Sequence, residues 1–123
     1  MPHVAILDDE ADLLDMVSLG LAKYGFTTTC VLNHQHFFSE LLARRPDVIL
    51  MDIYIGKEDG RDICKLIKED NTFSNIPVIL YSAGNVSDES IKESGADEFV
   101  SKPFVVQELA EKLLKLCKQD GIL

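Results

Sequence analysis

Positive charge is scarce in this chain. Twelve lysines and arginines stand against 21 aspartates and glutamates, which gives a formal net charge of −9. Nucleic acids and anionic membrane surfaces are bound by basic faces, so this balance argues against both as direct partners. No apolar run approaches the length of a membrane span, and the N-terminus lacks the basic segment and long apolar stretch of a signal peptide. We therefore expect a water-soluble, monomeric fold in the cytoplasm.

Cysteine is also sparse. Cys30, Cys64 and Cys117 are odd in number, widely spaced and set in apolar patterns. This favours reduced core thiols over a disulfide framework or a metal site. His34 and His36 lie two residues apart, and on a helix that spacing points them to different sides, so a metal site there is disfavoured.

Short apolar runs and helical periodicities alternate five times along the chain. The predicted strands are Val4–Leu7, Phe26–Val31, Asp47–Asp52, Ile76–Tyr81 and Asp97–Val100. The predicted helices are Ala11–Tyr24, a segment from the N-cap Asn33 to Arg45, about Arg61 to Glu69, Ser87–Ser94, and about Val105 to Lys118. This alternation predicts a single doubly wound (βα)5 fold of class α/β, a three-layer sandwich with right-handed crossovers. A chain of 123 residues has room for one such domain, residues 1–123.

Apolar residues at helical spacing predict which face of each helix is buried. Gly25 and Gly95 are predicted to end the first and fourth helices in a left-handed conformation. The predicted inward residues are Leu14, Val17 and Leu21 in the first helix; Phe38, Leu41 and Leu42 in the second; Ile63, Leu66 and Ile67 in the third; and Val106, Leu109, Ala110, Leu113 and Cys117 in the last.

Chemistry-bearing residues follow the predicted strands. Asp52 ends the central strand, Asp8 and Asp9 follow the first, Ser82 follows the fourth and Lys102 follows the fifth. The carboxyl ends of parallel strands share one sheet edge, where ligands bind, so we expect these side chains to converge. Carboxylates in one crevice repel each other, so the site needs either raised pKa values or a bound cation. A hard divalent ion such as Mg²⁺ is the simpler answer, and Lys102 and Ser82 suit phosphoryl oxygens.

Several motifs, in this order and spacing, resemble the receiver domain of two-component response regulators. The motifs are Asp8-Asp9, Leu50-Met51-Asp52, Asp59-Gly60, Ser82-Ala83, Gly95-Ala96-Asp97 and Lys102-Pro103-Phe104. The likeness covers nearly the whole chain and implies a parallel five-stranded sheet of flavodoxin-like order 2-1-3-4-5. It also implies a cis Lys102-Pro103 bond.

The resemblance further implies roles for the residues at this edge. Asp52 would be the phosphoacceptor, attacking a phosphohistidine on a sensor histidine kinase or a histidine phosphotransfer protein to give an acyl phosphate. Asp8, Asp9, Asp52 and the backbone carbonyl of Tyr54 would hold Mg²⁺. Such a domain catalyses only its own phosphorylation and dephosphorylation, so it is a regulatory phosphoacceptor rather than an enzyme.

By the same resemblance, Ser82 and Lys102 would bind phosphoryl oxygens, and Ser82 and Phe99 would form the switch. Phosphorylation would draw the hydroxyl inward and move the aromatic ring. This would alter the face made by the fourth helix, the fifth strand and the last helix, and thereby regulate a downstream output protein or domain. Two alternatives stay open from the residues: a homodimer that forms on phosphorylation, and a chain that acts alone or belongs to a longer regulator.

Some residues depart from the family pattern or bear on other classes of protein. Gly56 stands where the family commonly has proline and should loosen the loop after the central strand. An aspartate-nucleophile phosphatase would need a second carboxylate two residues after Asp52, where this chain has the bulky Tyr54. A flavin-binding module would place its phosphate on the first loop, where Asp8-Asp9-Glu10 would repel it. A receiver that docks constitutively without phosphorylation is disfavoured by the intact acceptor, acidic pair, hydroxyl and lysine.

Overall fold

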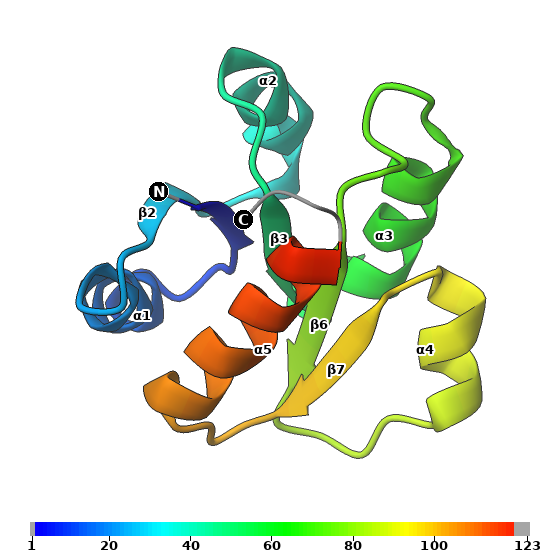
Figure 1. Ribbon diagram of the computed structural model, residues 1–123. Coiled ribbons are helices and arrows are strands. Elements are labelled where there is room, and N and C mark those ends of the chain that lie inside the picture. Colours follow the sequence, from blue (N-terminus) through cyan, green and yellow to red (C-terminus); the bar gives the residue numbers. More distant parts are fainter. Residues whose placement is uncertain (1, 120–123) are drawn as a thin grey trace.

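Five parallel strands form the central sheet of the computed structural model, which describes residues 2–119 (Figure 1). Their order is β2-β1-β3-β6-β7, and their bounds are His3–Leu7 (β1), Thr27–Val31 (β2), Val48–Asp52 (β3), Val78–Ser82 (β6) and Glu98–Ser101 (β7). Counting these main strands alone gives 2-1-3-4-5, so the predicted α/β fold and strand order are confirmed. Met1 and residues 120–123 of the predicted domain lie outside the described residues.

Helices connect successive strands of this sheet, and the last helix follows β7. Their bounds are Ala11–Ala22 (α1), Phe37–Ala43 (α2, preceded by a 3₁₀ turn, η1, at His34–His36), Gly60–Glu69 (α3), Asp88–Ser94 (α4) and Val106–Gln119 (α5). Helices α1 and α5 cover one face of the sheet, and α2, α3 and α4 cover the other (Figure 1). Within residues 2–119, no helix is both long enough and apolar enough to span a membrane.

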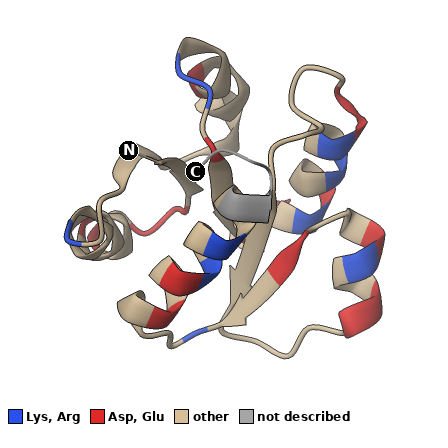
Figure 2. Cartoon of the chain, viewed as in Figure 1, with Lys and Arg blue, Asp and Glu red and all other residues tan. Residues whose placement is uncertain are grey.

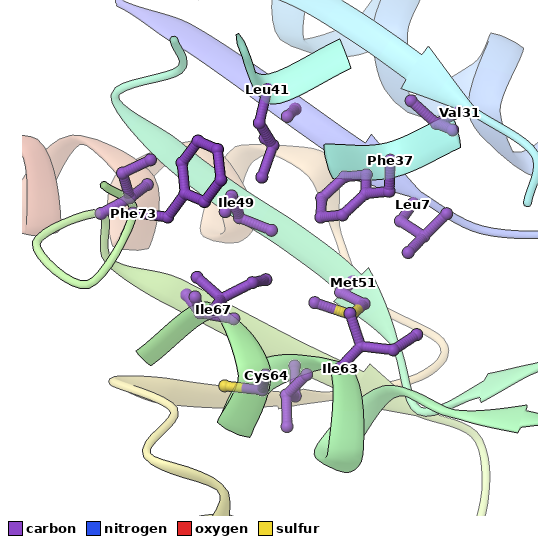
Figure 3. Packing of buried hydrophobic residues seen from close by; sticks show 14 of the residues in the cluster. Leu7, Val31, Phe37, Leu41, Ile49, Met51, Ile63, Cys64, Ile67 and Phe73 are labelled. Carbon is purple, nitrogen blue, oxygen red and sulfur yellow. The ribbon is translucent and has the colours of Figure 1, made fainter. Parts of the chain in front are cut away.

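The strands form where they do because the core is apolar on both sheet faces. All five residues of β1, β3 and β6 are buried, as a parallel sheet covered by two helical layers requires. The side chains of β3 belong to two hydrophobic clusters, one on each face of the sheet. Ile49 and Met51 face α2 and α3, whereas Val48 and Leu50 face α1 and α5. Figure 3 shows the cluster on the α2 and α3 side, in which Phe37 of α2 and Ile67 of α3 pack with Ile49 and Met51 of β3.

Caps and glycines end several helices as the sequence predicts. Gly25 and Gly95 have φ angles of 89° and 83°, the left-handed conformation that favours glycine. The Ser87 hydroxyl accepts the Ser90 N–H at 3.2 Å and caps α4. The predicted inner face of α1 is also confirmed, because Leu14, Val17 and Leu21 are all buried.

Three predicted core positions are wrong. In α2 the buried residues are Phe37 and Leu41, which lie about one helical turn apart, and Leu42, the next residue around the helix, is 70% exposed. In α3 the buried stripe is Gly60, Ile63, Cys64 and Ile67, so Leu66 points sideways and is 57% exposed. Cys30 is exposed because β2 is an edge strand with a partner on one side only, whereas Cys64 and Cys117 are buried as predicted.

The segment after β3 is more ordered than the predicted loop. Tyr54–Ile55 (β4) and Glu58–Asp59 (β5) form an antiparallel hairpin, with Gly56 in its turn at φ 57°. Ile53 and Ile55 are buried, which anchors the hairpin to the core. Gly60 then starts α3, and its N–H donates to the Ile53 carbonyl at 2.6 Å.

The fourth main strand, β6, starts at Val78 rather than at the predicted Ile76, because Pro77 has no N–H to donate to a neighbouring strand.

Candidate functional site

The carboxyl ends of β1 and β3 lie side by side and bring four carboxylates together. Strand register pairs Leu7 with Met51, so Asp8 and Asp52 leave neighbouring strands at the same level. Asp8, Asp9, Glu10 and Asp52 each offer one oxygen, and these oxygens all lie within 4.8 Å of one another. Figure 2 shows the resulting acidic segment between β1 and α1. The predicted carboxylates Asp8, Asp9 and Asp52 are therefore brought together, and Glu10 joins them.

Asp8 is fully buried and held from both sides of its carboxylate. Its Oδ1 accepts the Glu10 N–H at 2.8 Å, and its Oδ2 accepts the hydroxyl of Tyr81. Its backbone N–H donates to the Val31 carbonyl of β2 at 3.1 Å. Asp9 is exposed, and its Oδ2 accepts the Gly56 N–H at 2.8 Å, which ties the acidic segment to the hairpin turn.

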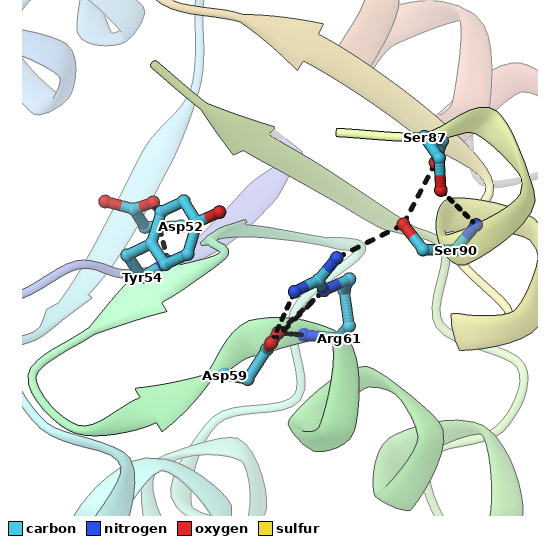
Figure 4. Close-up of polar contacts among 6 residues, drawn as sticks. All are labelled: Asp52, Tyr54, Asp59, Arg61, Ser87 and Ser90. Atoms are coloured by element: carbon cyan, nitrogen blue, oxygen red, sulfur yellow. Dashed lines mark hydrogen bonds and ion pairs between the residues drawn. The ribbon is translucent and has the colours of Figure 1, made fainter. Parts of the chain in front are cut away.

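Asp52 is the buried carboxylate at the end of the central strand. Its Oδ1 accepts the Tyr54 N–H at 3.0 Å, and its Oδ2 lies 3.1 Å from the Lys102 Nζ (Figure 4 shows the contact with Tyr54). Burial raises the pKa of Asp52, and the charge of Asp8 adds to that rise, whereas the Tyr54 N–H and Lys102 oppose it. The carboxylate is thus poorly solvated and has a cation at hand.

Lys102 is the cation of this cluster. Its Nζ lies 3.1 Å from Asp52 Oδ2, 3.6 Å from Asp8 Oδ2 and 4.0 Å from Glu10 Oε1. Its backbone N–H donates to the Ser82 carbonyl at 2.9 Å, which fixes the residue at the end of β7. The Lys102-Pro103 bond is cis, as the family resemblance implies.

The two residues predicted to act as a switch lie in β6 and β7, on the side of β3 that faces away from β1. Ser82 is fully buried at the end of β6, and its hydroxyl accepts the Gly84 N–H at 3.1 Å. Phe99 lies in β7 opposite Leu80 in strand register, and it packs, partly buried, against the core cluster beneath α3 and α4. Ser82 thus belongs to the strand that lies between β3, which ends at Asp52, and β7, which contains Phe99.

The hairpin beside the site is braced to α4. Asp59 caps α3 by accepting the Arg61 N–H at 2.8 Å, and its carboxylate also holds the Arg61 guanidinium, with Nη2 at 2.6 Å (Figure 4). Arg61 in turn donates to the Ser90 hydroxyl of α4 at 3.2 Å. The pKa of Asp59 is lowered by this arginine.

Gly56 sits at a positive φ that proline is unable to adopt, so the family's commoner residue would not fit this turn.

Tyr81 is a residue of the site that sequence reasoning did not identify. The sequence pattern predicts it only as the last residue of an apolar strand, yet its hydroxyl reaches Asp8 and its ring centroid lies 4.8 Å from the Lys102 Nζ. Burial, with the hydrogen bond to Asp8, raises its pKa well above the ordinary value. The sequence feature that points to it is an aromatic residue with a hydroxyl group near the end of a strand whose other residues are aliphatic or small.

The donor set suits a hard divalent cation. The four clustered side chains supply only carboxylate oxygens, two of them buried and two exposed. Close carboxylates of this kind are stabilised by a cation that prefers oxygen ligands, and the exposed pair leaves room for water in its shell. The cluster could therefore hold a metal ion.

Comparison with known proteins identifies the same class. Residues 4–114 match the family model described as "Response regulator receiver domain". The chain is 30% identical over 120 residues to the phosphate regulon transcriptional regulatory protein PhoB of Pseudomonas aeruginosa, covering 96% of this chain and 52% of PhoB. It is 33% identical over 124 residues to the heme response regulator HssR of Staphylococcus saprophyticus, covering 99% of this chain and 54% of HssR. The chain thus spans about half the length of these curated relatives.

Solved structures agree with this assignment. The receiver domain of the Francisella response regulator 1452 superposes with a TM-score of 0.86 at 26% identity, covering 97% of this chain and 98% of that one. The family model covers nearly the whole chain, and the acidic pocket lies at the carboxyl edge of the matching fold. The chain therefore belongs to the response regulator receiver domain family of two-component signalling, and its pocket of Asp8, Asp9, Glu10 and Asp52 fits the phosphoacceptor site of a regulatory domain rather than the active site of a classical enzyme.

Proposed function

We propose that this chain is a Mg²⁺-dependent switch that accepts a phosphoryl group on Asp52. The observation that carries the proposal is the position of Asp52, buried at the end of the central strand, 3.1 Å from Lys102 and within one carboxylate cluster. The phosphodonor is a histidine on a sensor kinase or on a phosphotransfer protein. Because that donor acts inside the cell, the proposal places the domain in the cytoplasm.

Phosphoryl transfer to Asp52 is a displacement at phosphorus. A carboxylate oxygen of Asp52 forms the new P–O bond as the P–N bond to the donor histidine breaks, and the electron pair of that bond stays on the histidine nitrogen. Lys102 neutralises charge on the phosphoryl oxygens, and the Ser82 hydroxyl donates a hydrogen bond to one of them.

Mg²⁺ belongs to the same proposal. The residues that would hold it are Asp8, Asp9, Asp52 and the backbone carbonyl of Tyr54, and the all-oxygen cluster supports this choice. When bound, the ion would offset the negative charge that the carboxylates and the phosphoryl group bring together. Glu10 completes the cluster from the exposed side.

The signal leaves through the surface formed by α4, β7 and α5. In the unphosphorylated domain the Ser82 hydroxyl accepts the Gly84 N–H. A phosphoryl group on Asp52 competes for that hydroxyl, and Phe99 moves into the space that the shift of Ser82 opens. The altered α4–β7–α5 surface then regulates an output protein or an output domain. Residues 1–123 act as one receiver domain in this scheme.

Intact-mass spectrometry tests the acceptor directly. Wild-type protein incubated with phosphoramidate and Mg²⁺ should gain one phosphoryl group, and the gain should vanish with a chelator or in Asp52→Asn. Asp62→Asn is the matched control, because Asp62 is an exposed carboxylate in the first turn of α3. Absence of an adduct in folded, Mg²⁺-loaded wild type, and with a phosphorylated kinase as donor, would refute the proposal, as would an adduct that persists in Asp52→Asn.

A second measurement separates acceptance from switching. Ser82→Ala should still gain the phosphoryl group, more slowly, but hydrogen exchange in α4, β7 and α5 should then no longer change on phosphorylation. If wild type is phosphorylated without any change in exchange over these elements, the acceptor role stands and the α4–β7–α5 output surface is wrong.

A further inference from the structure

Tyr81 occupies a buried position in β6 that an aliphatic side chain could fill. It is 1% exposed and lies in the apolar cluster that α1 and α5 cover, together with Ile6, Leu50 and Ile79. In strand register it pairs with Asp52 on one side and Val100 on the other. Its ring therefore lies beneath the carboxylate site, and the only polar atom of its side chain is the hydroxyl.

The hydroxyl of Tyr81 forms a hydrogen bond with the carboxylate of Asp8. It donates to Asp8 Oδ2, whereas Oδ1 of the same carboxylate accepts the Glu10 N–H at 2.8 Å. Asp8 is 0% exposed, so these two donors hold its carboxylate in place without direct help from solvent. A buried phenol costs free energy unless it is hydrogen-bonded, and a buried carboxylate costs more unless donors compensate it. Each group supplies what the other lacks.

The ring of Tyr81 lies against the ammonium group of Lys102. The ammonium Nζ lies 4.8 Å from the ring centroid, a cation–π distance, and 3.6 Å from the Asp8 oxygen that the hydroxyl contacts. Phe104 also packs against the ring of Tyr81, edge to face, with centroids 5.8 Å apart and ring planes at 74°. The ring thus has one orientation, set by Phe104 and by the hydrogen bond to Asp8, and it supports the cation that also reaches Asp52 at 3.1 Å.

We propose that Tyr81 is a positioning residue that couples the metal-binding carboxylate Asp8 to the phosphoryl-binding cation Lys102. The hydroxyl orients the Asp8 carboxylate for Mg²⁺ binding, and the cation–π contact with the ring holds the Lys102 ammonium next to Asp52. The two actions are separable, because Tyr81→Phe removes only the first and Tyr81→Leu removes both. This inference rests on the proposed function, since it takes Asp8 as a Mg²⁺ ligand.

A hydrogen bond that orients a metal ligand contributes to the affinity of the site for its metal. Tyr81→Phe should therefore weaken Mg²⁺ binding by about tenfold or more, the range found when such supporting hydrogen bonds are removed. Its maximal rate of phosphorylation at saturating Mg²⁺ should stay within about twofold of wild type, because the ring beneath Lys102 is kept. Tyr81→Leu should show the same loss of affinity and, in addition, a lower maximal rate.

Calorimetric titration with MgCl₂, in the absence of any phosphodonor, measures the affinity, and mass spectrometry with acetyl phosphate at saturating MgCl₂ measures the rate. Tyr24→Phe is the matched control, because it removes a phenol hydroxyl from a half-exposed residue after α1, remote from the carboxylates. In an Asp8→Asn background, Tyr81→Phe should have no further effect on affinity. Wild-type affinity in Tyr81→Phe, or an equal effect in the Asp8→Asn background, would overturn the proposal.

A spectroscopic measurement keeps Tyr81 in place and does not depend on a variant of the core. The chain has no tryptophan and three tyrosines, so Tyr24→Phe/Tyr54→Phe leaves Tyr81 as the only strong ultraviolet emitter. Emission of a phenol depends on the charge of the carboxylate it contacts, so MgCl₂ should change it saturably, with the affinity that calorimetry gives. Unchanged emission during calorimetrically recorded binding would refute the coupling alone, whereas no binding to wild type would refute the proposed metal site and this inference with it.

Discussion

Gly60 offers a sharp test of how tightly the acceptor is built. It is buried as the first residue of α3, directly behind the carboxyl end of β3. A Cβ at this position would collide with the Asp52 carbonyl oxygen and lie 3.0 Å from the Ile53 Cα and 3.1 Å from the Asp52 carbonyl carbon. Ordinary contacts of a Cβ lie at 3.4–4 Å. All three atoms are backbone, so no side chain is able to rotate away, and Gly60→Ala must push α3 or the acceptor strand aside.

The cost follows from the packing. Forcing one methyl group into a filled core costs about 1–3 kcal/mol. Replacing glycine by alanine inside a helix returns at most about 1 kcal/mol, and less at the first helical position. We therefore expect Gly60→Ala to lower the free energy of unfolding by about 2 kcal/mol, which for a domain of this size corresponds to roughly 6–10 °C in Tm.

Urea unfolding followed by circular dichroism measures this loss. The matched control is Gly84→Ala, where the nearest atoms to a new Cβ lie at 3.8 Å, so its stability should stay within about 0.5 kcal/mol of wild type. The displaced Asp52 should also accept a phosphoryl group more slowly in Gly60→Ala than in Gly84→Ala. If Gly60→Ala is as stable as Gly84→Ala, the backbone contact behind the acceptor is not the constraint described here.

Three other perturbations have defined outcomes. Burial lowers the pKa of His3 below 6.5, so the unfolded chain binds a proton that the folded chain resists, and stability should fall as the pH drops below about 6.5; urea unfolding of wild type and His3→Gln at several pH values measures the difference. Mg²⁺ at about one hundred times its Kd should stabilise wild type by about 2.7 kcal/mol in thermal scans, and Asp9→Asn should lose most of this. Ile67→Ala should cost about 2–5 kcal/mol of unfolding free energy, whereas Leu66→Ala should stay within about 0.5 kcal/mol of wild type.

Each of these predictions has an outcome that contradicts it. A pH profile of stability that is the same with and without His3 would remove the buried histidine as its cause. Equal Mg²⁺ stabilisation of Asp9→Asn and wild type would exclude Asp9 from the ligands. A large loss of stability in Leu66→Ala would mean that Leu66, rather than Cys64, belongs to the buried stripe of α3.

Much of the fold is predictable because it depends on local patterns. The runs Val4–Leu7 and Val48–Met51 are continuously apolar, as is typical of strands covered on both faces, and Leu14, Val17 and Leu21 repeat at the helical period. The carboxyl ends of parallel strands share an edge in any such sheet. The convergence of Asp8, Asp9 and Asp52 therefore follows from their places after strands, without knowledge of any contact.

Helix faces are less predictable where a helix is short or apolar on several sides. In α3, Leu66 and Cys64 both fit a helical period with Ile63 and Ile67, and only the position of the sheet decides which of them is buried. In α2, the apolar residues Phe37, Phe38, Leu41 and Leu42 offer more than one stripe at helical spacing, and only the position of the sheet decides that Phe37 and Leu41 are buried.

Residue order and periodicity are enough to specify the alternation of strands and helices, the buried strands and the set of polar residues at one sheet edge. The contacts that those residues make depend on how the elements pack in three dimensions. Tyr81 and Asp8 are 73 residues apart, and Gly56 and Asp9 are 47 apart, so each pair meets only once the sheet has assembled. Contacts of this kind depend on side-chain reach and backbone register across strands, and local pattern carries neither.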